Sequence, residues 1–288
     1  MQEIKGWRQN EEEQEEKEMR IGFTKMHGAG NDYIYVNTME HPIANPTECA
    51  ITWSDRHKGI GADGLVLIGD SQVADFSMRI FNADGSEAKM CGNACRCIGK
   101  YVYDKGLTDK TEITLETLSG VKTLNLHIGT DGKVESVTVE MGVPKACRPV
   151  ALTESPLLAG LAKARFVDMG NPHLVVFVQN AQDIDILTLG PTLEKLHGGE
   201  DGINVEFVEI KSDDTLRMRV WERGSGLTLG CGTGACASAV TAIAEGLARR
   251  SVTVSMDGGD VRIDYDEHTR QISMTGDATI VYEGEMED

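Results

Sequence analysis

Two cysteines in this chain stand in matching contexts that could support proton-transfer chemistry. Cys91 and Cys231 are each followed by a glycine and then by a helical pattern, so each thiol is expected at the start of a helix. Unpaired backbone N–H groups and the helix dipole favour negative charge there, which is expected to bring the pKa of the thiol toward neutrality. A thiolate on one side of a carbon and a thiol on the other could invert a stereocentre, because one removes a proton while the other delivers one.

The two cysteines belong to an internal repeat with a single offset of 140 residues. Asn31 precedes Cys91 by 60 positions (91 − 31), and Asn171 precedes Cys231 by the same 60 positions (231 − 171). Two further matching segments end nine residues before the cysteines, at 79–82 and 219–222. Several matches at one offset predict two structurally similar halves, each presenting one cysteine.

The elements that must position these residues are mostly strands. Short apolar runs bounded by Gly, Asp and Asn are typical of strands. They are found at Tyr33–Asn37, Leu65–Ile68, Phe76–Phe81, Ile113–Thr117 and Val134–Glu140. Helical patterns cover Asn93–Lys105 and Ala235–Arg250, with shorter candidates at 47–57 and 188–198. The second long helix is rich in alanine, and the arginine pair at 249–250 suits its C-terminus. This mixture predicts an α+β fold.

Composition excludes several classes of protein. A net charge of −18 disfavours nucleic acid as a partner, because a binder must neutralise phosphates with a basic face. The sequence contains no apolar run of membrane-spanning length and no apolar signal segment at its start, so neither a membrane protein nor a secreted one is expected. Seven cysteines without a signal segment favour free thiols in the cytoplasm. Residues 1–19 hold seven glutamates and are expected to form a disordered or helical acidic extension outside the fold.

Other uses of these residues are less consistent with the spacing. Cys91, Cys95 and Cys97 do not show the paired C-x2-C spacing of structural zinc, so no metal site is predicted. Two glycine-rich segments, 28–32 and 59–64, neither complete a dinucleotide-binding motif nor carry the P-loop lysine. The remaining cysteines are expected to be structural. These are Cys49, Cys95, Cys97, Cys147 and Cys236.

Several long motifs, in order, resemble those of the diaminopimelate epimerases, and the match covers nearly the whole chain from Met19 onward. The matching stretches are 27–33 (His-Gly-Ala-Gly-Asn-Asp-Tyr), 55–57 (Asp-Arg-His), 59–63 (Gly-Ile-Gly-Ala-Asp), 81–86 (Phe-Asn-Ala-Asp-Gly-Ser), 90–93 (Met-Cys-Gly-Asn), 170–173 (Gly-Asn-Pro-His), 204–205 (Asn-Val), 222–224 (Glu-Arg-Gly) and 231–236 (Cys-Gly-Thr-Gly-Ala-Cys). The order of so many motifs makes this resemblance more specific than any one glycine string.

The resemblance implies two pseudo-symmetric halves, each a curled, mostly antiparallel β-sheet around a central α-helix, with the final strand returning to the first half. We expect the first half at 20–135 plus 277–288 and the second at 136–276. The resemblance also implies a homodimer that works without pyridoxal phosphate or metal, and catalytic cysteines at Cys91 and Cys231. The implied substrate contacts are Asn31, Asn82, Asn171, Asn204, Glu222 and Arg223, with backbone N–H groups of Gly92, Asn93, Gly232 and Thr233.

The predicted activity is interconversion of LL- and meso-diaminopimelate, a step toward lysine and peptidoglycan precursors. Arg223 could hold the distal carboxylate as a bidentate fork, Glu222 could accept from an ammonium, and His173 could support a cysteine or the substrate. Two departures from the family pattern concern the site, namely Ala94-Cys95 after the first cysteine and Gly64, where some members carry a glutamine that reaches the substrate. The alternatives are a racemase of another amino acid with the same two thiols and a phenazine-pathway type of protein without thiol chemistry.

Overall fold

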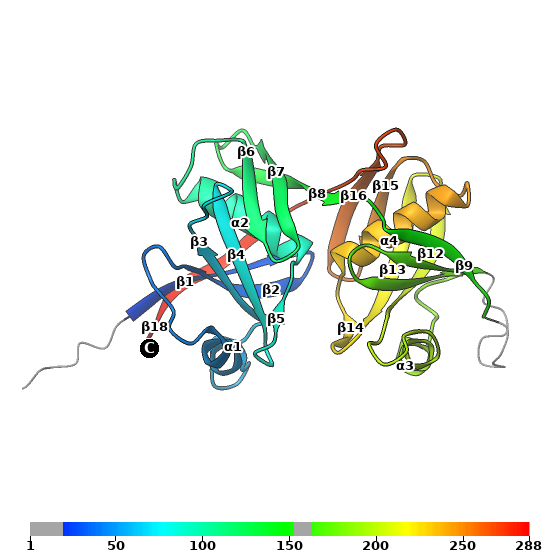
Figure 1. The fold of residues 1–288 in the computed structure, drawn as a ribbon, viewed down its shortest axis with the longest axis horizontal. Coiled ribbons are helices and arrows are strands. Elements are labelled where there is room, and N and C mark those ends of the chain that lie inside the picture. Colours follow the sequence, from blue (N-terminus) through cyan, green and yellow to red (C-terminus); the bar gives the residue numbers. More distant parts are fainter. Residues whose placement is uncertain (1–19, 153–162, 288) are drawn as a thin grey trace, which may run out of the picture.

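The computed structural model describes residues 20–152 and 163–287, and the predicted acidic extension at 1–19 lies outside them (Figure 1). The first half contains β1 (Arg20–Gly28), β2 (Asn31–Asn37), α1 (Pro46–Ser54), β3 (Gly64–Gly69), β4 (Phe76–Asn82), β5 (Glu87–Ala88), α2 (Gly92–Asp104), β6 (Glu112–Thr117), β7 (Gly120–Ile128) and β8 (Val134–Gly142). The second contains β9 (Ala146–Val150), β10 (Lys163–Asp168), β11 (Pro172–Val178), α3 (Ile186–His197), β12 (Asn204–Ser212), β13 (Thr215–Glu222), β14 (Gly226–Thr228), α4 (Gly232–Ala244), β15 (Ser251–Met256), β16 (Gly259–Tyr265) and β17 (Ile272–Gly276), and β18 (Thr279–Glu287) ends the chain. No helix among these described residues is both long and apolar enough to cross a membrane.

The order of elements repeats, which confirms the predicted pair of similar halves. The series from β1 to β8, with α1 and α2, recurs from β10 to β17, with α3 and α4. The last strand, β18, crosses back from the second half and pairs antiparallel with β1, as expected (Figure 1). In the same way β9, which follows β8, pairs antiparallel with β10.

The strands form one connected and mostly antiparallel network. Parallel pairing occurs between β2 and β3, β4 and β6, β11 and β12, and β13 and β15. Strand β8 pairs with β7 in its own half and with β17 in the other, so it ties the two sheets together. It also spans the expected boundary at 135/136, and the residue limits of the two halves stay a prediction.

Each half places one helix inside its curled sheet and one outside (Figure 1). In the first half, the inner face of the sheet and α2 share a core that includes Tyr35, Val66 and Ile98. The outer face packs under α1 through Ile34 and Leu65. Because both faces of β3 are covered, all six of its residues are buried, as is typical of strands between two layers. Helix α3 covers the corresponding outer face of the second half.

The predicted helices are confirmed, but the predicted end of α4 at Arg250 is wrong. Helix α4 ends at Ala244 because Gly246 adopts a left-handed conformation with φ of 68°. The N–H groups of Gly246 and Leu247 then bond to the carbonyls of Ile243 and Ala242, the pattern of a Schellman motif. A glycine 140 positions earlier, Gly106, closes α2 with φ of 75° in the same way.

Candidate functional site

Both cysteines of the predicted pair occupy the N-cap position of a central helix. Cys91 precedes α2 with φ of −135° and ψ of 121°, and Cys231 precedes α4 with φ of −120° and ψ of 115°. Each helix has thirteen residues, so the two thiols have matching local geometry. The first N–H groups of a helix have no acceptor within the helix, and they therefore face the region beside each sulfur.

The first turns of α2 and α4 both pack against the side chain of Met274. A Cβ atom placed on Gly92 would lie 2.6 Å from Met274 Cε, and one placed on Gly232 would lie 3.2 Å from the same atom. The hypothetical Cβ of Gly232 is also 3.7 Å from Asn93 Oδ1, so the first turn of α2 reaches the first turn of α4. Glycine at both positions permits this approach, and the fold brings together the residues predicted to bind a carboxylate.

Burial raises the pKa of both thiols above the ordinary cysteine value. At Cys91, the N–H groups of Ala94 and Asn93 oppose that effect. At Cys231, the carboxylates of Glu222 and Glu206 add to it, and the pKa is raised further. The expectation that the helix starts bring these pKa values toward neutrality is therefore wrong for the site as it stands, because desolvation outweighs the N–H groups.

The amide of Asn31 links Cys91 to a carboxylate. Cys91 Sγ donates to Asn31 Oδ1 at 3.4 Å, while Asn31 Nδ2 donates to Asp63 Oδ2 at 2.8 Å. Asp63 also accepts from Arg56 at 2.9 Å, and burial raises its pKa. Because the donor side of the Asn31 amide is held by Asp63, its oxygen faces the thiol. Cys91 itself is only half-buried.

A longer chain of polar groups leads away from Cys231. Its Sγ lies 3.4 Å from Thr233 Oγ1, which accepts from Asn171 Nδ2 at 3.2 Å. Asn171 Oδ1 lies 3.1 Å from His173 Nε2, and His173 Nδ1 lies 2.6 Å from Glu206 Oε1. The His173 and Glu206 side chains are both fully buried. The His173 ring therefore bridges the Asn171 amide and the Glu206 carboxyl group.

The predicted distal contacts lie close together on the second half. Asn204 Oδ1 accepts from the backbone N–H of Arg223 at 3.0 Å. The exposed guanidinium of Arg223 donates to the Asp201 carbonyl at 2.9 Å. Burial raises the pKa of Glu222, and its hydrogen bonds to Thr228 and Cys231 lower it in part. Glu222 is thus linked to the Cys231 thiol and precedes Arg223 in the sequence.

Asn82 is placed differently from the other asparagines. Its Nδ2 donates to Ser86 Oγ at 3.0 Å, and its N–H bonds to the Ser86 carbonyl. These bonds shape its own hairpin. Asn82 faces Gly64 across the β3–β4 pairing. A Cβ atom placed on Gly64 would lie 2.0 Å from the Phe81 carbonyl oxygen. No side chain therefore fits at Gly64 without a backbone shift.

A buried arginine that pairs with no carboxylate of the described residues lies behind the two helix starts. Arg96 is fully buried on α2, and its Nε donates to the Asp277 carbonyl at 2.9 Å on the segment between β17 and β18. Its Nη2 has no hydrogen-bond partner among the described residues. The guanidinium acts on the Cys91 thiol by lowering its pKa, against the larger effect of burial.

Three residues near the thiols were not predicted from the sequence, namely Tyr33, Asp63 and Glu206. Asp63 and Tyr33 occur in motifs of the family resemblance without an assigned role, and Glu206 stands two positions after Asn204. Side chains two apart on a strand share one face, so Asn204 with Glu206 and Asn31 with Tyr33 carried a usable signal. The other cysteines on the helices, Cys95, Cys97 and Cys236, are fully buried, and burial raises the pKa of each to about 12.

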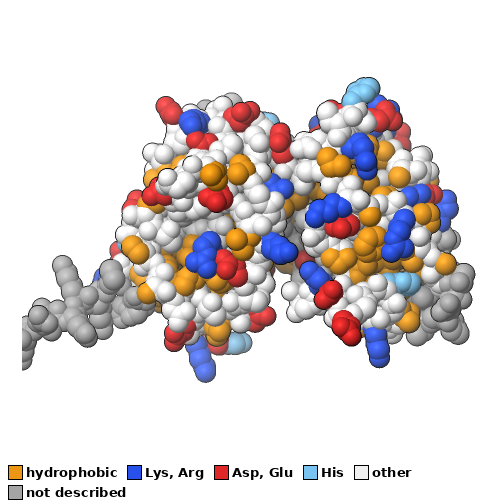
Figure 2. Space-filling view, in the orientation of Figure 1, with side chains coloured by type: hydrophobic (Ala, Val, Ile, Leu, Met, Phe, Trp, Pro, Cys, Tyr) orange, Lys and Arg blue, Asp and Glu red, His pale blue; other side chains and the backbone are white. Residues whose placement is uncertain are grey.

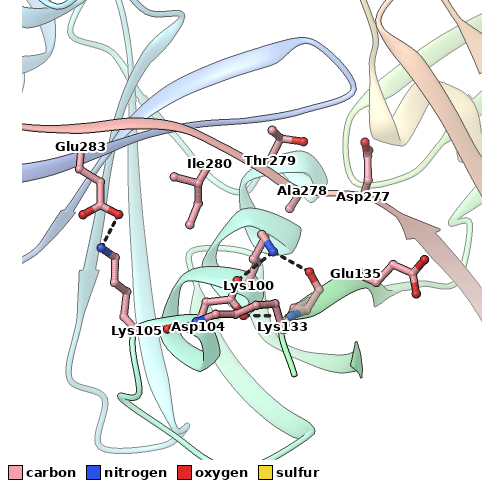
Figure 3. Close-up of a pocket in the computed structure, with 11 residues that line it drawn as sticks. Lys100, Asp104, Lys105, Lys133, Glu135, Asp277, Ala278, Thr279, Ile280 and Glu283 are labelled. Atoms are coloured by element: carbon pink, nitrogen blue, oxygen red, sulfur yellow. Dashed lines mark hydrogen bonds and ion pairs between the residues drawn. The ribbon is translucent and has the colours of Figure 1, made fainter. Parts of the chain in front are cut away.

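Two hollows lie away from the thiols, and neither is lined by Cys91 or Cys231. One, of about 550 Å³, adjoins the end of α2 and the segment 277–280, and its lysines are engaged by acidic or carbonyl groups (Figure 3). Lys100 pairs with Asp104 at 2.8 Å, and Lys105 pairs with Glu283 at 2.5 Å. The other, of about 540 Å³, is lined by Arg223 and the loop after α3. On the face shown in Figure 2 a furrow separates the two halves. Within the described ranges no group of three or more His, Cys, Asp or Glu could hold a metal ion.

Comparison with known proteins identifies a family. The family model described as diaminopimelate epimerase matches residues 23–147 and 165–281. A diaminopimelate epimerase from Bacteroides thetaiotaomicron is 58% identical over 93% of this chain and 98% of its own length. One from Methanococcus maripaludis strain C5 is 49% identical over 92% of this chain and 99% of its own.

Solved structures of low sequence identity share the fold. A phenazine biosynthesis protein of the PhzF family from Bacillus anthracis has a TM-score of 0.73 at 17% identity, covering 93% of this chain and 99% of its own. A hydroxyproline epimerase from Agrobacterium vitis, with bound trans-4-hydroxy-L-proline, has a TM-score of 0.66 at 16% identity, covering 93% and 91%. The predicted fold class of two pseudo-symmetric α+β halves is confirmed.

Proposed function

The chain belongs to the diaminopimelate epimerase family, and from that premise we propose that it interconverts LL- and meso-diaminopimelate by proton transfer between Cys91 and Cys231. As a member of that family the protein is an isomerase. One observation carries the mechanism: two thiols hold the same N-cap position on two helices whose first turns both pack against Met274. The matching placement supports one thiol on each face of a substrate carbon.

In the proposed reaction, the thiolate of one cysteine removes the α-proton, and the electron pair of the broken C–H bond passes into the adjacent carboxylate as an enolate-like charge. The thiol of the other cysteine then protonates the carbon from the opposite face. Afterwards the first sulfur carries the proton and the second is the thiolate, and the reverse reaction exchanges the roles. N–H groups of Gly92, Asn93, Gly232 and Thr233 stabilise the developing charge.

Recognition of the distal amino-acid group is assigned to the second half. Arg223 can bind a carboxylate through two parallel hydrogen bonds, and Glu222 and Asn204 can accept from an ammonium. Arg223 is exposed at a hollow of about 540 Å³, which supports access by a ligand. We assign the activity to lysine and peptidoglycan-precursor synthesis, in a cytoplasmic homodimer that uses neither pyridoxal phosphate nor metal.

The first test is incubation of the reduced protein with LL-diaminopimelate in D₂O without added cofactor, following stereoisomers and α-deuterium together. We expect the meso form with solvent deuterium at the inverted centre. Exchange with another amino acid alone would move the assignment to a racemase of that amino acid. The absence of exchange with every amino acid offered would overturn the proposal.

The second test replaces each thiol. Cys91→Ser and Cys231→Ser should each lower kcat by at least about 100-fold, because a hydroxyl is a far weaker acid than a thiol. Cys147→Ser is the matched control, since Cys147 lies on β9 with its Sγ against Arg165. Circular dichroism and thermal melting should be unchanged in all three. Parental activity in either catalytic variant contradicts the two-thiol mechanism.

A further inference from the structure

Tyr33 occupies the position in the first half that His173 occupies in the second. The two residues are 140 positions apart (173 − 33), the offset of the repeat. Tyr33 lies on β2 opposite Gly64 of the parallel strand β3, and His173 lies on β11 opposite Asn204 of the parallel strand β12. Gly64 and Asn204 are themselves 140 positions apart (204 − 64), so the two strand pairs have the same register.

The Tyr33 ring fills the space beside Gly64. A Cβ on Gly64 would lie 2.9 Å from Tyr33 Cε1 and 2.0 Å from the Phe81 carbonyl oxygen. The equivalent Asn204 carries a side chain that accepts from the Arg223 N–H. The first half therefore has no side chain at this position of β3, and a phenol from the neighbouring strand lies there instead.

The hydroxyl of Tyr33 belongs to the surroundings of Cys91. Burial raises the pKa of Tyr33 well above its ordinary value, the Cys91 thiolate raises it further, and a hydrogen bond with the Asn31 side chain lowers it in part. The residue is 6% exposed. The phenol therefore stays protonated near neutral pH, next to the amide whose oxygen accepts from the Cys91 thiol.

We propose that Tyr33 is a positioning residue for Cys91: its hydroxyl holds the Asn31 amide against that thiol, as His173 holds Asn171 in the chain leading to Cys231. The expected effect of Tyr33 on kcat rests on the proposed function, whereas its expected effect on the reactivity of Cys91 does not. The matching register of Tyr33 and His173, the contact of His173 with Asn171, and the lack of a side chain at Gly64 carry the proposal. Since the second half uses an ionisable His–Glu pair at this place, the two thiols are oriented by different chemistry.

The test compares Tyr33→Phe with Tyr35→Phe, which removes a buried hydroxyl two residues further along β2 within the same core. Tyr33→Phe should lower kcat about 3- to 10-fold, as expected for the loss of one hydrogen bond, with KM nearly unchanged. Tyr35→Phe should leave kcat unchanged. Tyr33→His should restore part of the rate, because an imidazole at the equivalent place reaches Asn171 in the second half.

Alkylation of the thiols supplies a readout that does not depend on the substrate. Iodoacetamide labelling followed by mass spectrometry gives a pH profile for each cysteine separately. Tyr33→Phe should shift the profile of Cys91 and leave that of Cys231 in place. If both profiles stay parental, or if Tyr35→Phe shifts Cys91 equally, the positioning role is refuted. If Tyr33→Phe shifts only the alkylation profile of Cys91, and the parent protein does not epimerise diaminopimelate, the proposed substrate is refuted. The positioning role of Tyr33 would then still stand.

Discussion

The buried pair of His173 and Glu206 offers the sharpest quantitative prediction. Both side chains are fully buried, and Nδ1 and Oε1 are 2.6 Å apart. Glu206→Ala leaves the imidazole N–H without an acceptor in a region that water does not reach. His173→Ala leaves the buried Glu206 side chain without its hydrogen-bond partner. Removing one partner of such a pair costs about 3–5 kcal/mol, because the remaining group is buried without compensation.

For a chain of this size, the loss corresponds to a decrease of about 6–10 °C in Tm. The double variant Glu206→Ala/His173→Ala leaves neither group unpaired. Its free energy of unfolding should therefore be lower than that of the parent protein by much less than the sum of the two single losses. We expect a coupling energy of at least about 2 kcal/mol from the double-mutant cycle.

Urea unfolding of the four proteins measures this coupling directly. The matched control is the cycle on Arg249 and Asp213, whose charged atoms are 2.8 Å apart but whose side chains are 66% and 57% exposed. That cycle should give less than about 0.5 kcal/mol, as solvent screens the pair. Additive effects at His173 and Glu206, within about 0.5 kcal/mol, would refute the reasoning that each buried side chain depends on the other as its hydrogen-bond partner.

Three further predictions concern packing and ionisation. Gly64→Ala should lower the free energy of unfolding by about 3 kcal/mol in urea, because its Cβ meets the Phe81 carbonyl; an unchanged value contradicts the close approach. The Lys110 ammonium lowers the pKa of Asp75, so its contribution is present above the unfolded-state pKa and lost as pH falls through the folded-state pKa. Asp75→Asn should thus cost about 1 kcal/mol at pH 7 and progressively less as the pH falls below the unfolded-state pKa, and a cost that stays constant over that range would be inconsistent. Cys231 should be alkylated with an inflection at higher pH than Cys91, since burial raises the pKa of both thiols and the Glu222 and Glu206 carboxylates raise that of Cys231 further; the reverse order refutes that assignment.

The repeat made much of the fold predictable. The offset of 140 residues placed Cys91 and Cys231 at two helix starts, and the structure has both as N-cap residues. The same offset also relates Gly106 to Gly246, the residues that end the two helices. The repeated glycine marks the end of α4 better than the arginine pair does. A glycine in the left-handed conformation ends a helix, whereas positive charges only stabilise the C-terminus of a helix that ends for another reason.

The polar networks around the thiols were less predictable. Whether Asn31 contacts a cysteine or shapes a turn depends on the register of β2 against β3, which one sequence does not reveal. Asn82 illustrates the same difficulty, since its amide bonds to Ser86 in its own hairpin. The upward shift of the two thiol pKa values could not be predicted from the sequence for another reason. A helix start is visible in a sequence, whereas the depth at which the sulfur is buried is a property of the assembled halves.

The buried Arg96 has a consequence for how such a molecule can be constructed. Its position in the repeat is that of Cys236 (236 − 96 = 140), and the helices that carry the two residues, α2 and α4, contact each other where the halves meet. Burial raises the pKa of Cys236, and the Arg96 guanidinium acts on it in the opposite direction. Two separate, identical subunits would carry arginine at both places and set one guanidinium against another in a dry interior. A single polypeptide that contains both halves can encode one cation and one thiol there, which a dimer of identical halves cannot.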